Sequence, residues 1–265
     1  WAVGTRKLVE FSRPHREIKD RWVFPEETGY ATDLYKLVGA SEDRQNDLET
    51  RFFRAIDQRG SDILDAMHNG HLPSDAKTRS DWFNFAISLR QRHPEGVTHL
   101  RETAFTEFAR QIRKNKRALR PSDRGKPIKE LLKDQFWEQG ATLALQHAIL
   151  LPLSGTAFIR AFWYLYKIEF SPQRFVTSDQ PTVMGKLPGV GFHFVMPIGP
   201  KLAFIAAGNP ADVARLVAHE AVFVAAINAI VTEQAVRFVW GSDPMIVAHL
   251  NAQPGLIPKL RLQSP

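Results

Sequence analysis

"GFHFVMPIGPKLAFIAAG", residues 191–208, is the stretch that decides the fold class. Two apolar runs flank a Pro-Ile-Gly-Pro segment at 197–200, and this combination is typical of a β-hairpin that turns at the Pro/Gly residues. The two strands of a hairpin are antiparallel. The stretch therefore predicts an antiparallel sheet in the C-terminal half of the chain.

The segments around this hairpin predict more of the same sheet and one long helix. Residues 210–235 are strongly helical in pattern, with Asn209 as the N-cap and a proline at the first position. Aromatic residues alternate along 162–170, which favours a strand, although a helix remains an alternative. The segments 174–179 and 236–244 each predict a further strand.

The middle of the chain changes to a helical period. Four helices are predicted, at residues 41–70, 80–93, 95–119 and 128–151, so residues 41–151 form a helical block. Ser41 and Ser80 are the N-caps of the first two, and Gly70 stops the first. Gly60 weakens the middle of the first helix and could divide it in two.

The chain as a whole is predicted to be a single α+β domain spanning residues 1–265. Its sub-regions are a β and irregular opening at 1–40, the helical block at 41–151, and a sheet with one packed helix at 152–265. The opening contains a short N-terminal β-hairpin around Gly4-Thr5 within residues 1–13. An extended piece follows at residues 20–25.

Composition excludes several classes of chemistry. The chain has no cysteine, so disulfides, thiolate zinc sites, iron–sulfur clusters and thiol nucleophiles are excluded. It has no apolar run long enough for a membrane span, and we expect a cytoplasmic location. The sequence assigns no metal site, no cofactor and no oligomeric state. The chain begins at Trp1 without a methionine, so it gives no information about a signal peptide.

Residues 110–133 hold ten basic and two acidic side chains, an excess of positive charge above the net +7 of the whole chain. A basic patch of this kind is typical of contact with phosphate groups, so we expect a nucleic acid or another polyanion as partner. The predicted binding residues are Arg113, Lys114, Lys116 and Arg117. The alternative is a solvated helix face whose long basic side chains shield apolar surface.

Two similar corners raise the question of a chemical site. "RFVTSDQP" (174–181) and "RFVWGSDP" (237–244) both place a Ser-Asp pair at the end of a strand and beside a proline. A structural interpretation suffices, because Asp179 can accept backbone hydrogen bonds in an Asx-turn and the proline keeps the preceding residue extended. A carboxylate at a strand end also suits metal binding or general-base work. Both interpretations stay open for Asp179, whereas the structural one is favoured for Asp243.

The chain resembles the domain-of-unknown-function 4238 family. The segment Phe175–Pro181 is similar to the family's Phe-(Ile/Leu/Val)-Thr-Ser-Asp-x-Pro motif, and Pro197–Pro200 to its later turn. The resemblance implies functional weight on Asp179 and on four further residues, which are Ser178, Asn228, Glu49 and Arg92. It also places Asp33–Tyr35 at the family's Asp-x-Tyr segment. Two departures are that Leu89 stands where a glutamine is common and that the family's opening His-Tyr-x-Pro segment would precede Trp1.

Three functions follow as hypotheses. The first is binding of an anionic partner through the 110–133 patch. The second is a hydrolytic enzyme, with phosphodiesters as the candidate substrate class, that uses Asp179 as base or ligand and Glu49 as its partner. The third is a protein-interaction or structural component, which an exposed apolar patch would distinguish from an enzyme.

Overall fold

The computed structural model describes residues 6–12, 18–29, 53–92, 110, 152–185, 187, 189 and 191–244. The described residues up to 29, from 60 to 90 and from 152 onward belong to one compact unit, and the others to a second. The first unit combines helices with two four-stranded antiparallel sheets, so the α+β class is confirmed. The single-domain organisation stays a prediction.

The described helices are α1 (Arg54–His68), α2 (Ala76–Gln91), α6 (Pro152–Arg160), α7 (Pro210–Val217) and α8 (Glu220–Gln234), with a short 3-10 helix η1 (Pro25–Glu27). The described strands are β1 (Leu8–Ser12), β2 (Lys19–Val23), β3 (Phe162–Lys167), β4 (Thr177–Ser178), β5 (Val183–Met184), β6 (His193–Gly199), β7 (Leu202–Ala207) and β8 (Val239–Gly241).

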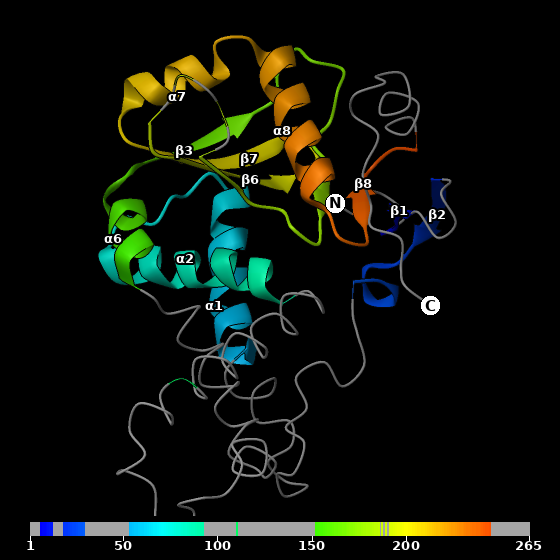
Figure 1. Cartoon of the computed structure of the whole chain (residues 1–265), viewed down its shortest axis with the longest axis horizontal. Coiled ribbons are helices and arrows are strands. Elements are labelled where there is room, and N and C mark those ends of the chain that lie inside the picture. The colour runs from blue at the N-terminus through cyan, green and yellow to red at the C-terminus, as the bar shows by residue number, and fades with distance from the viewer. Residues whose placement is uncertain are drawn as a thin grey trace, which may run out of the picture. The chain divides into compact units, whose positions relative to one another are not determined.

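One sheet has the strand order β3-β7-β6-β5 and is covered by helices on both faces. Helices α7 and α8 lie on one side of it, and α6, α2 and the C-terminal part of α1 on the other (Figure 1). The sequence of strand β7 is apolar throughout because both of its faces are buried. Ala203, Ile205 and Ala207 face the α7–α8 side, while Phe204 and Ala206 face α2 and α6.

Aromatic rings fill the core between this sheet and helices α2 and α6. The Phe204 ring meets Trp163 at 4.8 Å and Trp82 at 5.6 Å between centroids, in both cases edge to face. Edge-to-face packing is the arrangement that the ring quadrupoles favour. Arg79 of α2 completes this layer, since its guanidinium donates to the carbonyls of Ile159 and Ala161 and stacks 4.6 Å over the Trp163 ring.

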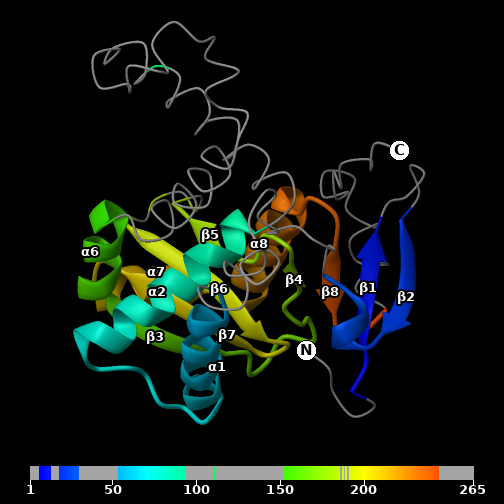
Figure 2. The ribbon, with the colours of Figure 1, turned by 90° about the horizontal axis from the view of Figure 1, so that it is seen from below.

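The other sheet has the order β2-β1-β8-β4 and brings both ends of the described chain together (Figure 2). Its register places Glu10 opposite both Arg21 and Trp240, and Trp240 opposite Thr177. These four residues therefore form one row across the sheet. The opposite face carries Val9, Phe11 and Val239 into the core that α8 covers.

The prediction of one long helix at 210–235 is wrong, because the chain bends by 91° between α7 and α8. Asn209 is the N-cap as predicted, and its Oδ1 accepts the Asp212 N–H at 2.9 Å. The break falls at His219, whose backbone is extended. It lets the next residue, Glu220, turn its carboxylate to a segment far away in the chain, as described below.

The hairpins are confirmed, with shifted positions. Strand β6 continues through Pro197 to Gly199, so the turn lies at Pro200 and Lys201 rather than at 197–200. Pro197 is tolerated inside the strand because the register shifts between Pro197 and Gly199, as at a β-bulge. The N-terminal hairpin pairs β1 with β2, and the turn predicted at Gly4-Thr5 lies outside the described residues.

Among the helices, the alternative of a division at Gly60 does not occur, and the Ser80 cap is wrong. Helix α1 runs without a break through Gly60, which packs against the Phe85 ring so closely that a Cβ would lie 2.3 Å from it. Helix α2 begins earlier than Ser80, since the Asp75 carboxylate accepts the Thr78 N–H at 2.9 Å. This hydrogen bond lowers the pKa of Asp75. Gly70 ends α1 with φ +82°, as predicted for a C-terminal glycine.

Several predictions fall outside the described residues. They are the Ser41 cap and the first part of its helix, the Asp33–Tyr35 segment, the helix at 128–151, and the helix at 95–119 apart from Arg110. The predicted strands at 174–179 and 236–244 exist, but they join the sheet of β1 rather than that of the 191–208 hairpin.

Candidate functional site

Asp179 directly follows strand β4, and its side chain binds the backbone segment that leads into β8. Its carboxylate accepts three consecutive backbone N–H groups, from Val236 at 2.9 Å, Arg237 at 2.6 Å and Phe238 at 3.3 Å. Its own N–H donates to the Phe238 carbonyl at 3.3 Å. These donors belong to a distant segment and not to the Asp179 turn. The aspartate thus links two strand ends that are far apart in sequence.

Ser178 and Asn228 serve the same junction. The Asn228 side chain takes the place of a neighbouring strand, because its Oδ1 accepts the Val176 N–H at 2.9 Å and its Nδ2 donates to the Arg174 carbonyl at 2.8 Å. The Ser178 hydroxyl donates to the Val231 carbonyl at 3.1 Å and accepts the Gln180 N–H at 3.1 Å. The short turn predicted at this corner is therefore made by Ser178 rather than by Asp179.

The C-terminal half of helix α8 contacts this segment. Besides Asn228, the Gln234 amide donates to the carbonyls of Thr182, at 3.0 Å, and Gln180. Four backbone polar groups of this segment, those of Arg174, Val176, Gln180 and Thr182, are thus satisfied by side chains of one helix. The structure brings together Asp179, Ser178 and Asn228, three of the five residues to which the family resemblance gave weight.

The similar corner at 237–244 has a structural explanation. Strand β4 pairs antiparallel with β8, and Ser178 lies opposite Val239. The two Arg-Phe-Val segments therefore end in adjacent strands of one sheet, as the sequence suggested. Asp243 is exposed, in contrast to the half-buried Asp179.

Arg92 belongs to the second unit and contacts two other residues there. Its guanidinium lies 4.1 Å above the Phe53 ring, and its Nη1 meets both carboxylate oxygens of Asp57 at 2.7 and 2.9 Å. Its functional weight stays a prediction.

The remaining predicted site residues lie outside the described part of the chain. They comprise the helical acid of the family resemblance and the four cations of the basic patch. They are Glu49, Arg113, Lys114, Lys116 and Arg117. Their roles therefore stay predictions.

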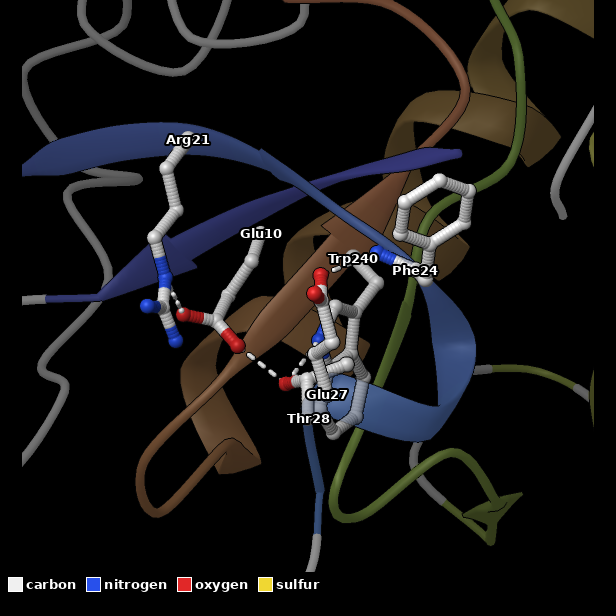
Figure 3. A network of polar contacts seen from close by, with 6 residues as sticks. All are labelled: Glu10, Arg21, Phe24, Glu27, Thr28 and Trp240. Carbon is white, nitrogen blue, oxygen red and sulfur yellow. Dashed lines mark hydrogen bonds and ion pairs between the residues drawn. The ribbon is translucent and has the colours of Figure 1, made fainter. Parts of the chain in front are cut away.

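The row across the β1 sheet carries a buried carboxylate that the sequence did not single out. Glu10 is 1% exposed, and its Oε1 accepts the Arg21 Nε–H at 2.7 Å. Its Oε2 accepts the Thr28 hydroxyl, whose oxygen in turn accepts the Trp240 indole N–H at 3.0 Å (Figure 3). Thr28 is held in place by η1, where the Glu27 carboxylate accepts the Phe24 N–H at 2.8 Å.

This network could be found only from the strand register. Along the sequence Glu10 is a single acid in an apolar strand, and it gives no sign of its partners Arg21, Thr28 and Trp240. A buried carboxylate is stable only when charged or hydrogen-bonding partners replace its water. The network meets that need and joins the N-terminal hairpin to β8.

A third carboxylate, Glu220, closes the end of the other sheet. It accepts the backbone N–H groups of Glu169 at 2.9 Å, Phe170 at 2.8 Å and Ser171, and the Tyr166 hydroxyl at 2.9 Å. These donors, that of Glu169 first, lower the pKa of Glu220 to about 2. Burial, and then the hydrogen bond to Glu220, raise the pKa of Tyr166.

The three carboxylates Glu10, Asp179 and Glu220 share one kind of role, since each binds donors from a distant segment. Within the described ranges, no group of three or more His, Asp or Glu side chains lies close enough to hold a metal ion. The geometry of this part of the chain is that of polar anchors between segments.

No single helix among the described residues is long and apolar enough to cross a membrane. Joined together, α7 and α8 would pass on length and composition, but they are the pair bent by 91°.

Comparison with known proteins gives one match. Residues 1–244 match the model of the family described as "Protein of unknown function (DUF4238)", and the chain belongs to that family. No curated protein and no solved structure matches.

Proposed function

We propose that this member of the family binds an anionic partner, such as a nucleic acid, through the basic patch at residues 110–133. The observation that carries the proposal is the concentration of charge, with ten basic and two acidic side chains in this one segment. The remainder of the chain is near neutral, since the whole carries +7. Locally clustered cations bind phosphates by releasing condensed counterions.

The contacts of Asp179 support binding over the hydrolytic alternative. A carboxylate offers about four lone-pair positions. Three backbone N–H groups already donate to Asp179. A general base or a metal ligand needs such positions for its substrate or ion. A hydrolase that uses Asp179 with Glu49 is therefore the second hypothesis.

The test is the salt dependence of binding to a short fluorescein-labelled DNA, single-stranded and duplex, measured by fluorescence anisotropy. The variant replaces Arg113, Lys114, Lys116 and Arg117 by glutamine. If each contacts one phosphate, the slope of log K against log salt becomes shallower by roughly 0.9 per residue on the duplex, or about 3.6 in total, and by roughly 0.7 per residue on the single strand, or about 2.8 in total.

The matched control removes the same number of charges elsewhere, at the exposed residues Lys19, Arg54, Lys77 and Arg215. We expect this control to keep most of the wild-type slope. Equal slopes for the two variants would show that only net charge matters and would remove the proposal. Phosphodiesterase activity that Asp179→Asn abolishes without changing thermal stability would favour the hydrolase instead.

A further inference from the structure

Exposed apolar side chains gather around β3. Five large hydrophobic residues are exposed in the described part of the chain, and four of them lie on β3, on the turn after it, or on the first turn of α8. These four are Phe162 (40% exposed), Tyr164 (41%), Phe170 (87%) and Val222 (67%). The fifth, Trp22, lies on β2 of the other sheet. Clustered exposure of this kind marks an interaction site more often than scattered exposure does.

Strand β3 is an edge strand. Among the described strands it pairs with β7 alone (Figure 2), so every second residue directs its backbone polar groups outward. One face of β3 is covered, with Trp163 buried in the aromatic core. On the other face Tyr166 packs against Phe223 of α8, whereas Phe162 and Tyr164 stay exposed at alternate positions, where they can contact alternate side chains of an added strand.

The exposed aromatic beyond β3 is held firmly. The Glu220 carboxylate accepts the N–H groups of Glu169, Phe170 and Ser171, so it fixes the backbone of the turn that presents Phe170. The Tyr166 hydroxyl bonds the same carboxylate and ties the turn to β3. A fixed backbone reduces the ordering entropy that a partner must overcome on binding.

The charges around this edge indicate the chemistry of the partner. Arg160 and Lys167 are exposed at the two ends of β3, and the exposed Lys201 lies beside the strand's end, since its carbonyl accepts the Ile168 N–H at 2.8 Å. Glu169 is the exposed acid of the same turn. We propose that β3 binds an extended, acidic segment of a partner protein as an added strand, with Phe162, Tyr164 and Phe170 contacting its apolar side chains.

A second copy of this chain fits the same edge less well. Antiparallel pairing of β3 with itself would bring the Arg160 end of one copy to the Lys167 end of the other. Like charges directly opposite each other destabilise a strand pair. The charge pattern therefore favours a different, acidic strand. This inference does not depend on the 110–133 patch.

The experiment is selection of a random peptide display library on the intact protein, followed by anisotropy measurements with the selected synthetic peptides. We expect peptides with alternating apolar and acidic residues. The variant Phe162→Thr/Tyr164→Thr keeps good β-propensity and should weaken their binding by at least about tenfold. Trp22→Thr, which removes the exposed aromatic of the other sheet, is the control and should leave binding unchanged.

A backbone readout separates strand addition from simple adhesion. Two versions of a selected peptide are compared, one methylated at its odd-numbered backbone nitrogens and one at its even-numbered ones. One version should lose binding, because only every second N–H of an added strand donates to β3. The inference is overturned if the library yields no binder, if the binders are not acidic, or if the double variant binds them as tightly as the wild type. It is also overturned if sedimentation shows a dimer that the double variant dissociates, since the occupant would then be a second copy.

Discussion

Replacing Asp179 by alanine should destabilise the fold, because the residue anchors the start of β8. The change leaves the N–H groups of Val236, Arg237 and Phe238 without their acceptor. A hydrogen bond to a charged group contributes about 1.5–3 kcal/mol. The three donors share one half-buried carboxylate that water partly reaches, so we expect a total loss of roughly 3 kcal/mol rather than the sum.

Two measurements check this value. For a chain of this size, roughly 3 kcal/mol corresponds to a melting temperature lower by about 6–12 °C in circular dichroism. Hydrogen exchange gives a local readout, since the amides of residues 236–238 should exchange up to about a hundredfold faster. Asp179→Asn keeps one acceptor oxygen and should lie between alanine and the wild type.

Asp243→Ala is the matched control, because it changes the aspartate of the similar corner where the side chain is exposed. Its free energy of unfolding should stay within about 0.5 kcal/mol of the wild type. Equal stability for Asp179→Ala and Asp243→Ala would refute the anchoring role. That result would favour a chemical role for Asp179 instead.

Two further predictions concern a second anchor, Glu220, and the core. The pKa of Glu220 is lowered to about 2, so its ionised carboxylate stabilises the fold at pH values above its ordinary pKa of 4.5. This stabilisation is lost as the pH falls from about 4.5 to about 2 and the carboxylate becomes protonated. Glu220→Gln should therefore lower the melting temperature at pH 7 and converge with the wild type near pH 2, whereas the exposed Glu233→Gln should match the wild type throughout. Gly60→Ala should destabilise by about 1–3 kcal/mol despite better helix propensity, because its Cβ would lie 2.3 Å from the Phe85 ring. Adding Phe85→Ala should remove most of that extra cost in a double-mutant cycle, and simple additivity would contradict the clash.

Three residues of the candidate site, Asp179, Ser178 and Asn228, could be chosen from the sequence, but their contacts could not. The Thr-Ser-Asp-Gln-Pro segment and Asn228 could be chosen from motif resemblance, and the structure brings them together. The donors to Asp179 could not be chosen, because they lie at residues 236–238 and nothing local marks them. Glu10 was missed for the same reason.

Local patterns determined the α+β class, the β6–β7 hairpin, the Asn209 cap and the glycine that ends α1. Each of these depends on residues that are neighbours in the chain, where turn chemistry and hydrophobic period act directly. Only the tertiary structure decided that the helix after Asn209 breaks and that the strands divide between two sheets. In both cases a polar side chain finds its partners across a long stretch of sequence, and such pairing depends on how the strands are ordered in space.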